Sequence, residues 1–212
     1  MPGAPAHHAE LPLYLLRCAL RERPAGHDAG HDAGRDVDGP RLPLDLRLSN
    51  EERSEGARQL AVALGSTEPG ARPVVGLYAH ATGAKCLPPE WWGAVVGALQ
   101  TQAPWLQLIE FLPEDGHSRL GDDVRGTYTP ALRMLGAKLA ATSLFVIADG
   151  GILHLADAAG ARVLGLFRTT SPAQYAPRRP GSQALQGIDD APGSVAARII
   201  ELLAARASTP VV

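Results

Sequence analysis

The chain has 212 residues, with 20 Lys and Arg against 22 Asp and Glu, a formal net charge of −2, and 45% hydrophobic and 5% aromatic residues. This is the composition of an ordinary folded protein, and it excludes disordered and fibrous classes. The near-neutral charge, with no basic run, excludes the electrostatic character of a typical nucleic-acid-binding protein.

Cysteine content and the N-terminal sequence bear on the compartment. Cys18 and Cys86 are too few for a disulfide framework and do not have the spacing of metal ligands. No basic segment precedes an apolar core near the start, and no apolar run reaches the roughly eighteen residues that span a bilayer. We therefore expect a cytoplasmic protein with no signal peptide and no transmembrane segment, which leaves peripheral association with the inner membrane face open.

Residues 1–48 differ from the rest of the chain. One short amphipathic segment (residues 11–23) precedes a four-residue repeat over 25–36, in which Ala-Gly-His-Asp occurs twice and Ala-Gly-Arg-Asp follows. His27 and His31 could bind a metal from one helix face, but a glycine in every repeat opposes the helix. A solvated, low-complexity linker is favoured, so we interpret residues 1–48 as an N-terminal appendage.

Residue 49 begins a regular pattern. Ser49 or Asn50 is a candidate N-cap, followed by Glu51 and Glu52 in the first turn of a helix that closes at Gly65. Strands are then predicted at 73–79, 106–112, 123–128, 143–148 and 162–167, and helices at 88–100, 130–141, 151–159 and 194–207. This alternation predicts one α/β domain over residues 49–212, a Rossmann-like parallel sheet with helices on both faces.

Ligands of an open parallel sheet bind beyond the carboxyl ends of its strands, so the strand-to-helix loops are the candidate sites. Lys85, in the loop after the first strand, could neutralise a phosphate, although from this loop alone a solvated surface lysine is favoured. Glu114 follows the second strand, where a carboxylate could bind ribose hydroxyls. Taken alone, that segment is an ordinary turn.

The loop after the strand at 143–148 is the most informative. Gly150 and Gly151 allow close backbone approach, and the free N–H groups of the helix that follows form an anion site suited to a diphosphate. His154 in the first turn could bind the same phosphate or a sugar. The alternatives, an N-cap role for Asp149 and a hydrogen-bonded buried imidazole for His154, are equally plausible from these residues.

Two further observations concern the remaining loops. Residues 167–172 are rich in hydroxyl groups and begin with Phe167 and Arg168, which indicates either a loop that closes over a ligand or a polar connection. No Gly-x-Gly-x-x-Gly follows the first strand, which disfavours a dinucleotide-dependent enzyme.

The order of these motifs resembles the C-terminal half of glycosyltransferase family 9, the ADP-heptose:lipopolysaccharide heptosyltransferases. The resemblance rests on the Lys85 loop with Pro-Pro-Glu-Trp-Trp at 88–92, a strand ending near Glu114, Asp-Gly-Gly-Ile-Leu-His-Leu-Ala at 149–156, Val-Leu-Gly-Leu-Phe at 163–167 and Thr-Ser-Pro at 170–172. Gly150 stands where the family usually has Ser or Thr.

This resemblance implies a GT-B enzyme, in which two Rossmann-like domains face a cleft and the C-terminal one binds the nucleotide-sugar donor. It implies inverting transfer without a metal, so no cofactor is expected. The donor-binding residues implied are Lys85 on phosphate or sugar, Glu114 on ribose, Asp149 on the transferred sugar, Gly150, Gly151 and His154 at the diphosphate, and Thr170.

Chain length limits what this resemblance predicts. An acceptor domain with the catalytic base would need roughly another 150 residues, which residues 1–48 cannot supply. We expect a donor-binding half of a lipopolysaccharide or cell-surface glycan glycosyltransferase, with no catalytic base assigned. It would pair with an acceptor half or self-associate. The alternative is a non-enzymatic binding or assembly module of the same fold.

Overall fold

The computed structural model describes residues 44–66, 68–70, 72–188 and 191–207, with side chains described as far as Ala204. The predicted segment at 11–23 and the repeat containing His27 and His31 lie outside the described residues. The boundary at residue 48 stays a prediction.

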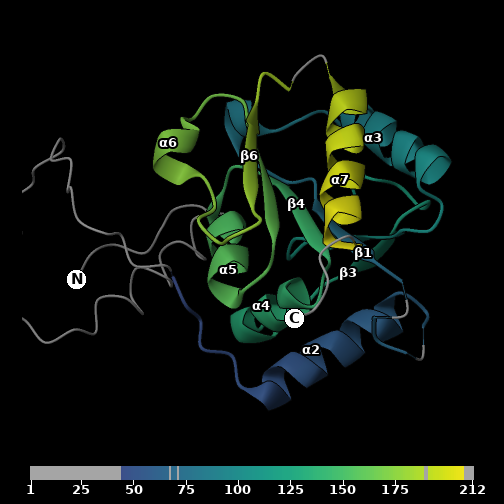
Figure 1. Cartoon of the computed structure of the whole chain (residues 1–212), viewed down its shortest axis with the longest axis vertical. Helices are drawn as coiled ribbons and strands as arrows, with labels where there is room; N and C mark the ends of the chain where they lie inside the picture. Colours follow the sequence, from purple (N-terminus) through teal and green to yellow (C-terminus); the bar gives the residue numbers. More distant parts are fainter. Residues whose placement is uncertain (1–43, 67, 71, 189–190, 208–212) are drawn as a thin grey trace, which may run out of the picture. The chain divides into compact units, whose positions relative to one another are not determined.

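One six-stranded sheet organises the described residues (Figure 1). Its strands are β1 (Val74–Tyr78), β2 (Gln107–Phe111), β3 (Arg125–Thr127), β4 (Leu144–Ala148), β5 (Val163–Phe167) and β6 (Gln183–Gln186). The order is β3-β2-β1-β4-β5-β6, and every neighbouring pair is parallel. The predicted Rossmann-like parallel sheet is confirmed, and β6 is a strand that the sequence pattern did not predict.

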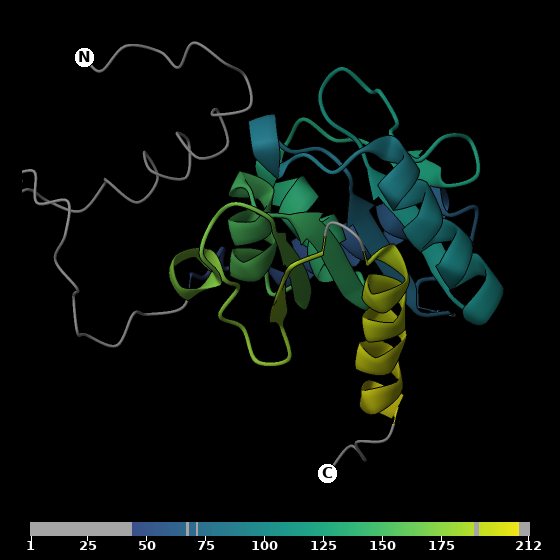
Figure 2. The same ribbon diagram turned by 90° about the horizontal axis from the view of Figure 1, so that it is seen from above.

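Helices cover both faces of this sheet. They are α2 (Asn50–Ala63), the 3-10 turn η2 (Gly83–Lys85), α3 (Pro89–Gln102), α4 (Leu132–Ala140), α5 (Gly151–Ala159), the one-turn α6 (Pro172–Tyr175) and α7 (Pro192–Ala207). Helices α3 and α7 lie side by side on one face, and α4 and α5 lie on the other, with α2 packed outside α4 (Figures 1 and 2).

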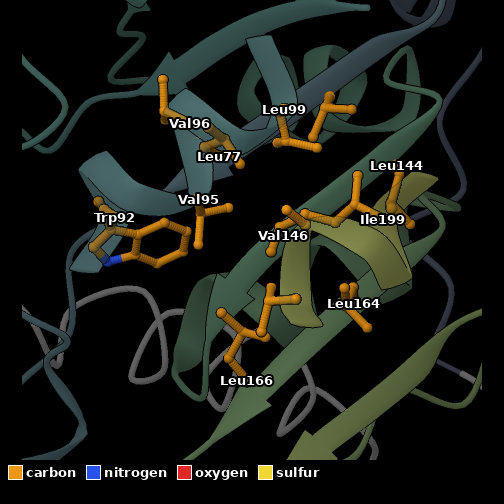
Figure 3. Packing of buried hydrophobic residues seen from close by; sticks show 14 of the residues in the cluster. Leu77, Trp92, Val95, Val96, Leu99, Leu144, Val146, Leu164, Leu166 and Ile199 are labelled. Atoms are coloured by element: carbon orange, nitrogen blue, oxygen red, sulfur yellow. The ribbon is translucent and has the colours of Figure 1, made fainter. Parts of the chain in front are cut away.

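The core on the α3 and α7 side is aliphatic, with one large aromatic ring. Trp92 and Val95 of α3 face Ile199 of α7 across Val146 and Leu164 of the strands (Figure 3). All five of these side chains are essentially inaccessible to water. Because burial of each such side chain contributes about 1.5–3 kcal/mol, this layer fixes the sheet against its two helices.

The opposite core contains the aromatic contact of the sheet. The rings of Phe111 and Phe145 meet edge to face at 5.5 Å and 82°. Gly76 lies beneath them, and a Cβ at this position would be 2.7 Å from a ring carbon of Phe111. Any larger residue at position 76 would displace that ring.

Helix α2 begins at a capping box and is tied to α4. The Ser49 hydroxyl accepts the Glu52 N–H, while Glu52 accepts the Ser49 N–H, so Ser49 is the N-cap. The Glu52 carboxylate also accepts two hydrogen bonds from the Arg133 guanidinium of α4, at 2.5 and 2.6 Å. The segment before α2 continues this packing, since the N–H of Leu46 donates to the Ala158 carbonyl of α5 at 2.8 Å.

Candidate functional site

Three of the predicted donor-binding side chains meet at the carboxyl edge of the sheet. Lys85 lies in η2 after β1, Asp149 directly follows β4, and Thr170 lies in the loop after β5. The Lys85 Nζ is 2.8 Å from Asp149 Oδ2, and the Thr170 hydroxyl donates to the same oxygen at 2.5 Å. Residues far apart in the sequence thus form one polar cluster.

The polar cluster is half shielded from water. The Asp149 side chain is 4% exposed, whereas that of Lys85 is 32% exposed. A carboxylate this buried needs a compensating cation and hydrogen bonds, which Lys85 and Thr170 supply. An ammonium has three donors, and Asp149 takes one of them. The exposed part of Lys85 therefore still offers positive charge and N–H donors to a ligand.

Helix α5 starts beside this cluster without a side-chain cap. Its N-cap is Gly150, in extended backbone at φ −178° and ψ 177°. The proposed N-cap role for Asp149 is therefore wrong, because its carboxylate is directed to Lys85 instead. A Cβ at Gly150 would meet nothing closer than the Ala148 carbonyl oxygen at 3.8 Å, so a ligand can approach this backbone closely. The uncapped N–H groups and the helix dipole, starting at Gly151, favour an anion here.

His154 lies in the first turn of α5 and is half-buried. Burial lowers the pKa of its imidazole, although Asp149 and Asp157 act in the opposite direction. The ring is therefore neutral near pH 7, with one N–H donor and one acceptor nitrogen. Its described neighbour is the Tyr175 ring, with centroids 6.5 Å apart. Binding of a phosphate or sugar by His154 stays a prediction.

Arg168 fastens the loop after β5 to the loop after β1. Its Nη1 donates to the carbonyl oxygens of Ala84 at 3.0 Å and Cys86 at 2.7 Å, on both sides of Lys85. Gln186 of β6 donates to the Thr170 carbonyl at 3.3 Å. Of the two interpretations of residues 167–172, these contacts favour the polar connection, which holds the Lys85 loop in position.

Glu114, the candidate ribose ligand, is exposed in the turn after β2. Strand β1 separates β2 from β4, so Glu114 comes from a different part of the edge than Asp149. Binding of a ribose by Glu114 stays a prediction.

Glu110 of β2 is the organised carboxylate that the sequence reasoning missed. It is completely buried, accepts the Ser118 hydroxyl at 2.5 Å and the Arg119 N–H at 3.0 Å, and lies 3.6 Å from His80 Nε2. Burial raises the pKa of Glu110, but the His80, Ser118 and Arg119 contacts outweigh it and leave the pKa below its usual value. A charged residue inside a short apolar strand was the signal that could have identified it.

The described residues contain no group of three or more His, Cys, Asp and Glu side chains placed to hold a metal ion. Within the same part of the chain, no helix has the length and apolarity needed to cross a membrane.

Comparison with known families identifies the group to which the fold and its carboxyl-edge loops belong. The profile of glycosyltransferase family 9 (heptosyltransferase) matches residues 26–192, which is most of the chain. The chain belongs to glycosyltransferase family 9. No curated protein sequence matches this family 9 chain significantly.

Solved structures agree at the level of the fold. E. coli ADP-heptose lipopolysaccharide heptosyltransferase II is 21% identical with a TM-score of 0.61, covering 77% of this chain and 54% of that protein. A family 9 glycosyltransferase from Veillonella parvula is 15% identical with a TM-score of 0.57, covering 75% and 46%. E. coli heptosyltransferase WaaC with ADP is 17% identical with a TM-score of 0.53, covering 62% and 44%. The family 9 chain thus spans about half the length of these relatives.

Proposed function

We propose that this family 9 domain binds a nucleoside-diphosphate sugar as the donor for glycosyl transfer in lipopolysaccharide or other cell-surface glycan synthesis. The observation that carries the proposal is the Lys85–Asp149–Thr170 cluster beside the uncapped start of α5. Cation, carboxylate and helix N-terminus lie together at the edge where parallel sheets bind nucleotides. WaaC with ADP among the relatives makes an adenine nucleotide the first donor to test.

The charged and neutral groups of the site would contact different parts of the donor. Lys85 and the N–H groups of Gly151 and its successor would bind the diphosphate and stabilise the negative charge that grows as it leaves. The Asp149 carboxylate would accept hydrogen bonds from hydroxyl groups of the transferred sugar, and neutral His154 would donate one to a phosphate or sugar oxygen. In this proposal protein donors stabilise the leaving diphosphate in place of a metal, and the transfer is an inverting displacement. We assign no catalytic base.

A second candidate function follows from the extent of the match. Because the chain spans about half the length of its structural relatives, the complete transferase activity is itself a proposal. A module that binds nucleotide without transferring sugar would keep the same site. The transferase would work with a complementary acceptor domain or a second copy of the chain, and at the inner membrane face if its acceptor is a lipid.

Nucleotide titration tests donor binding. We expect ADP or ADP-heptose, but not UDP or GDP, to stabilise the protein against thermal unfolding. At a hundredfold excess over Kd the gain is about 2.7 kcal/mol, or a few degrees in Tm. Lys85→Gln should weaken ADP binding about tenfold or more, since a charge-assisted contact to phosphate is lost. Arg58→Gln, an exposed residue of α2, removes the same charge and should leave the ADP affinity unchanged.

Product analysis separates the two functions. Transfer of heptose from ADP-heptose to a lipopolysaccharide core acceptor, by the chain with or without a separate acceptor domain, identifies the transferase. Binding without transfer under both conditions leaves the binding module. Absence of stabilisation by every nucleotide contradicts the proposed site.

A further inference from the structure

A hollow lies at the opposite edge of the sheet from the Lys85–Asp149–Thr170 cluster. Its volume is about 330 Å³, and its lining includes Ser143, Gly160, Arg162 and Arg179. Ser143 directly precedes β4 and Arg162 directly precedes β5, so the hollow lies at the amino ends of these parallel strands. Its size is at the lower end of the range for small-molecule pockets, about 300–1,000 Å³.

Positive charge gathers around this hollow at the end of α5. Arg162 and Arg179 line it, and a Cβ built at Gly160 would lie 3.5 Å from Arg179 Nη2 and 3.6 Å from Nη1 of Arg53 on α2. Gly160 ends α5 in the left-handed region at φ +96°, which brings the helix end between these side chains. Three guanidinium groups therefore approach one small region from three segments of the chain.

In this region the side chains of Arg53 and Arg179 donate hydrogen bonds to neutral oxygens. Arg53 Nη1 donates to the Ala159 carbonyl at 3.3 Å, and Arg179 Nε donates to the Asp157 carbonyl at 3.4 Å. The Asp157 carboxylate accepts the backbone N–H groups of Arg178 and Arg179 at 3.1 and 3.0 Å. These backbone carbonyls carry no formal charge, and the terminal Nη groups of Arg179 still have N–H donors to give.

We propose that this arginine-lined hollow is a binding site for a small phosphate-bearing anion, separate from the donor site. A guanidinium presents parallel N–H donors that match phosphate oxygens, and charges in a half-buried hollow are screened less than charges on an open surface. The Ser143 hydroxyl accepts the Val74 N–H at 3.1 Å, which leaves its own O–H free to donate to the anion.

The test maps the bound anion by NMR on the whole chain labelled with ¹⁵N. Inorganic phosphate and glycerol 3-phosphate are the probes. We expect saturable shifts of the amides of Ser143, Gly160 and Arg179. Arg179→Gln should raise the Kd about tenfold, the usual effect of losing a charge-assisted contact. The neighbouring exposed Arg178→Gln removes the same charge outside the lining and should leave the Kd unchanged.

A second variant keeps the test informative if Arg179→Gln does not fold. Arg179→Gln also loses the bond to the Asp157 carbonyl, so its thermal midpoint and its amide spectrum are compared with those of the wild type. If Arg179→Gln is unfolded, Arg53→Gln on α2 takes its place and should weaken phosphate binding severalfold.

Three outcomes overturn the proposal. The first is amide shifts confined to residues 150–154, because the phosphate then binds at the donor site. The second is the absence of saturable binding, and the third is an equal loss of phosphate affinity in the Arg178 and Arg179 variants.

Binding to lipid vesicles distinguishes the source of the phosphate. Binding to phosphatidylcholine vesicles only when they contain phosphatidic acid, lost in Arg179→Gln, identifies a lipid headgroup, whereas saturable binding of glycerol 3-phosphate alone identifies a soluble ligand.

Discussion

The buried carboxylate of Glu110 is surrounded by hydrogen-bond partners, most of them from the loop that follows its own strand. Its partners are Ser118 and Arg119, only eight and nine residues further along the chain, with His80 from the adjacent strand end. The carboxylate therefore holds the loop between β2 and β3 against the sheet. This loop also carries Glu114, so its position bears on the predicted donor site.

The lowered pKa of Glu110 makes the free energy of unfolding depend on pH in the acid range. A carboxyl group with a folded pKa below its usual 4.5 contributes stability above that value, and the contribution is lost as pH falls through the folded pKa. Glu110→Gln should destabilise the protein at pH 7, and the difference from the wild type should shrink as pH falls below about 4.5. Urea unfolding at a series of pH values measures this.

Glu68→Gln, at an exposed position after α2, is the matched control for this measurement. Its unfolding free energy should follow the wild-type curve. A Glu110→Gln difference that stays constant down to acid would show that the carboxylate charge contributes nothing.

Sequence reasoning located the site loops but not the contacts between them. Lys85 and Asp149 are separated by 64 residues, and the rule that ligands bind at carboxyl strand ends brought both to one edge without predicting an ion pair. Glu114 was predicted as a ligand because a carboxylate just past a strand can bind ribose hydroxyls, and Glu110 was not considered. A charge completely buried within a strand contradicts strand periodicity, and only the tertiary contacts of Ser118 and Arg119 explain it.

At the scale of elements, the predicted strands and helices were confirmed wherever apolar periodicity was strong. Strand β4 is buried at all five positions, and its continuous apolar run indicated that both faces are covered. Strand β6, Gln-Ala-Leu-Gln at the sheet edge, is only partly buried and has too little apolar pattern to be predicted. The one-turn α6 is too short for a periodicity to exist.

The contact between α2 and α4 depends on a missing side chain. A Cβ at Gly56 would lie 2.5 Å from the backbone carbon of Ala137 and 2.6 Å from its Cβ. Gly56→Ala should therefore push α2 away from α4 and destabilise the protein by about 1–3 kcal/mol. Gly93→Ala on α3, where nothing lies within 4 Å, should instead stabilise by about 0.5–1 kcal/mol, because alanine favours a helix. Thermal unfolding of both variants measures the contrast, and equal effects would contradict this packing.

Arg168 links the loop after β5 to the loop after β1 that carries Lys85. Removing the Arg168 contacts to the carbonyls of Ala84 and Cys86 should loosen the segment that presents Lys85. Arg168→Ala should speed amide hydrogen exchange over residues 83–86 and weaken ADP binding about tenfold, with little change in Tm. Arg58→Ala, at an exposed arginine of α2, is the control and should change neither. Unchanged exchange in Arg168→Ala would show that the loop is held by other contacts.

At the scale of the whole described domain, the two cores share one sheet. The strands alternate between them, so that Leu144 and Val146 belong to one core, and Phe145 and Ile147 belong to the other. Loss of either core exposes the same strands, and we therefore expect a single cooperative unfolding transition.

Ile199→Ala in α7 tests this coupling. Ile199 is completely buried on the α3 and α7 side, and its truncation should cost about 2–5 kcal/mol. Near-UV signals from the buried Trp91 and Trp92 on that side and backbone circular dichroism should shift together. Val62→Ala, at a side chain that is 63% exposed, should have little effect. Separate transitions for the two probes would show that the cores unfold independently.

The chain contains only two lysines, Lys85 and Lys138, and the fold treats them very differently. Lys138 is 5% exposed, and its amine donates to the Thr127 hydroxyl and the Tyr128 carbonyl, whereas Lys85 is 32% exposed at the candidate site. An acylating reagent therefore meets one accessible side-chain amine in the native domain. A ligand that covers Lys85 should slow its acylation. The extent of acylation at Lys85, measured by mass spectrometry, therefore reports how much of the donor site is occupied, without an engineered label.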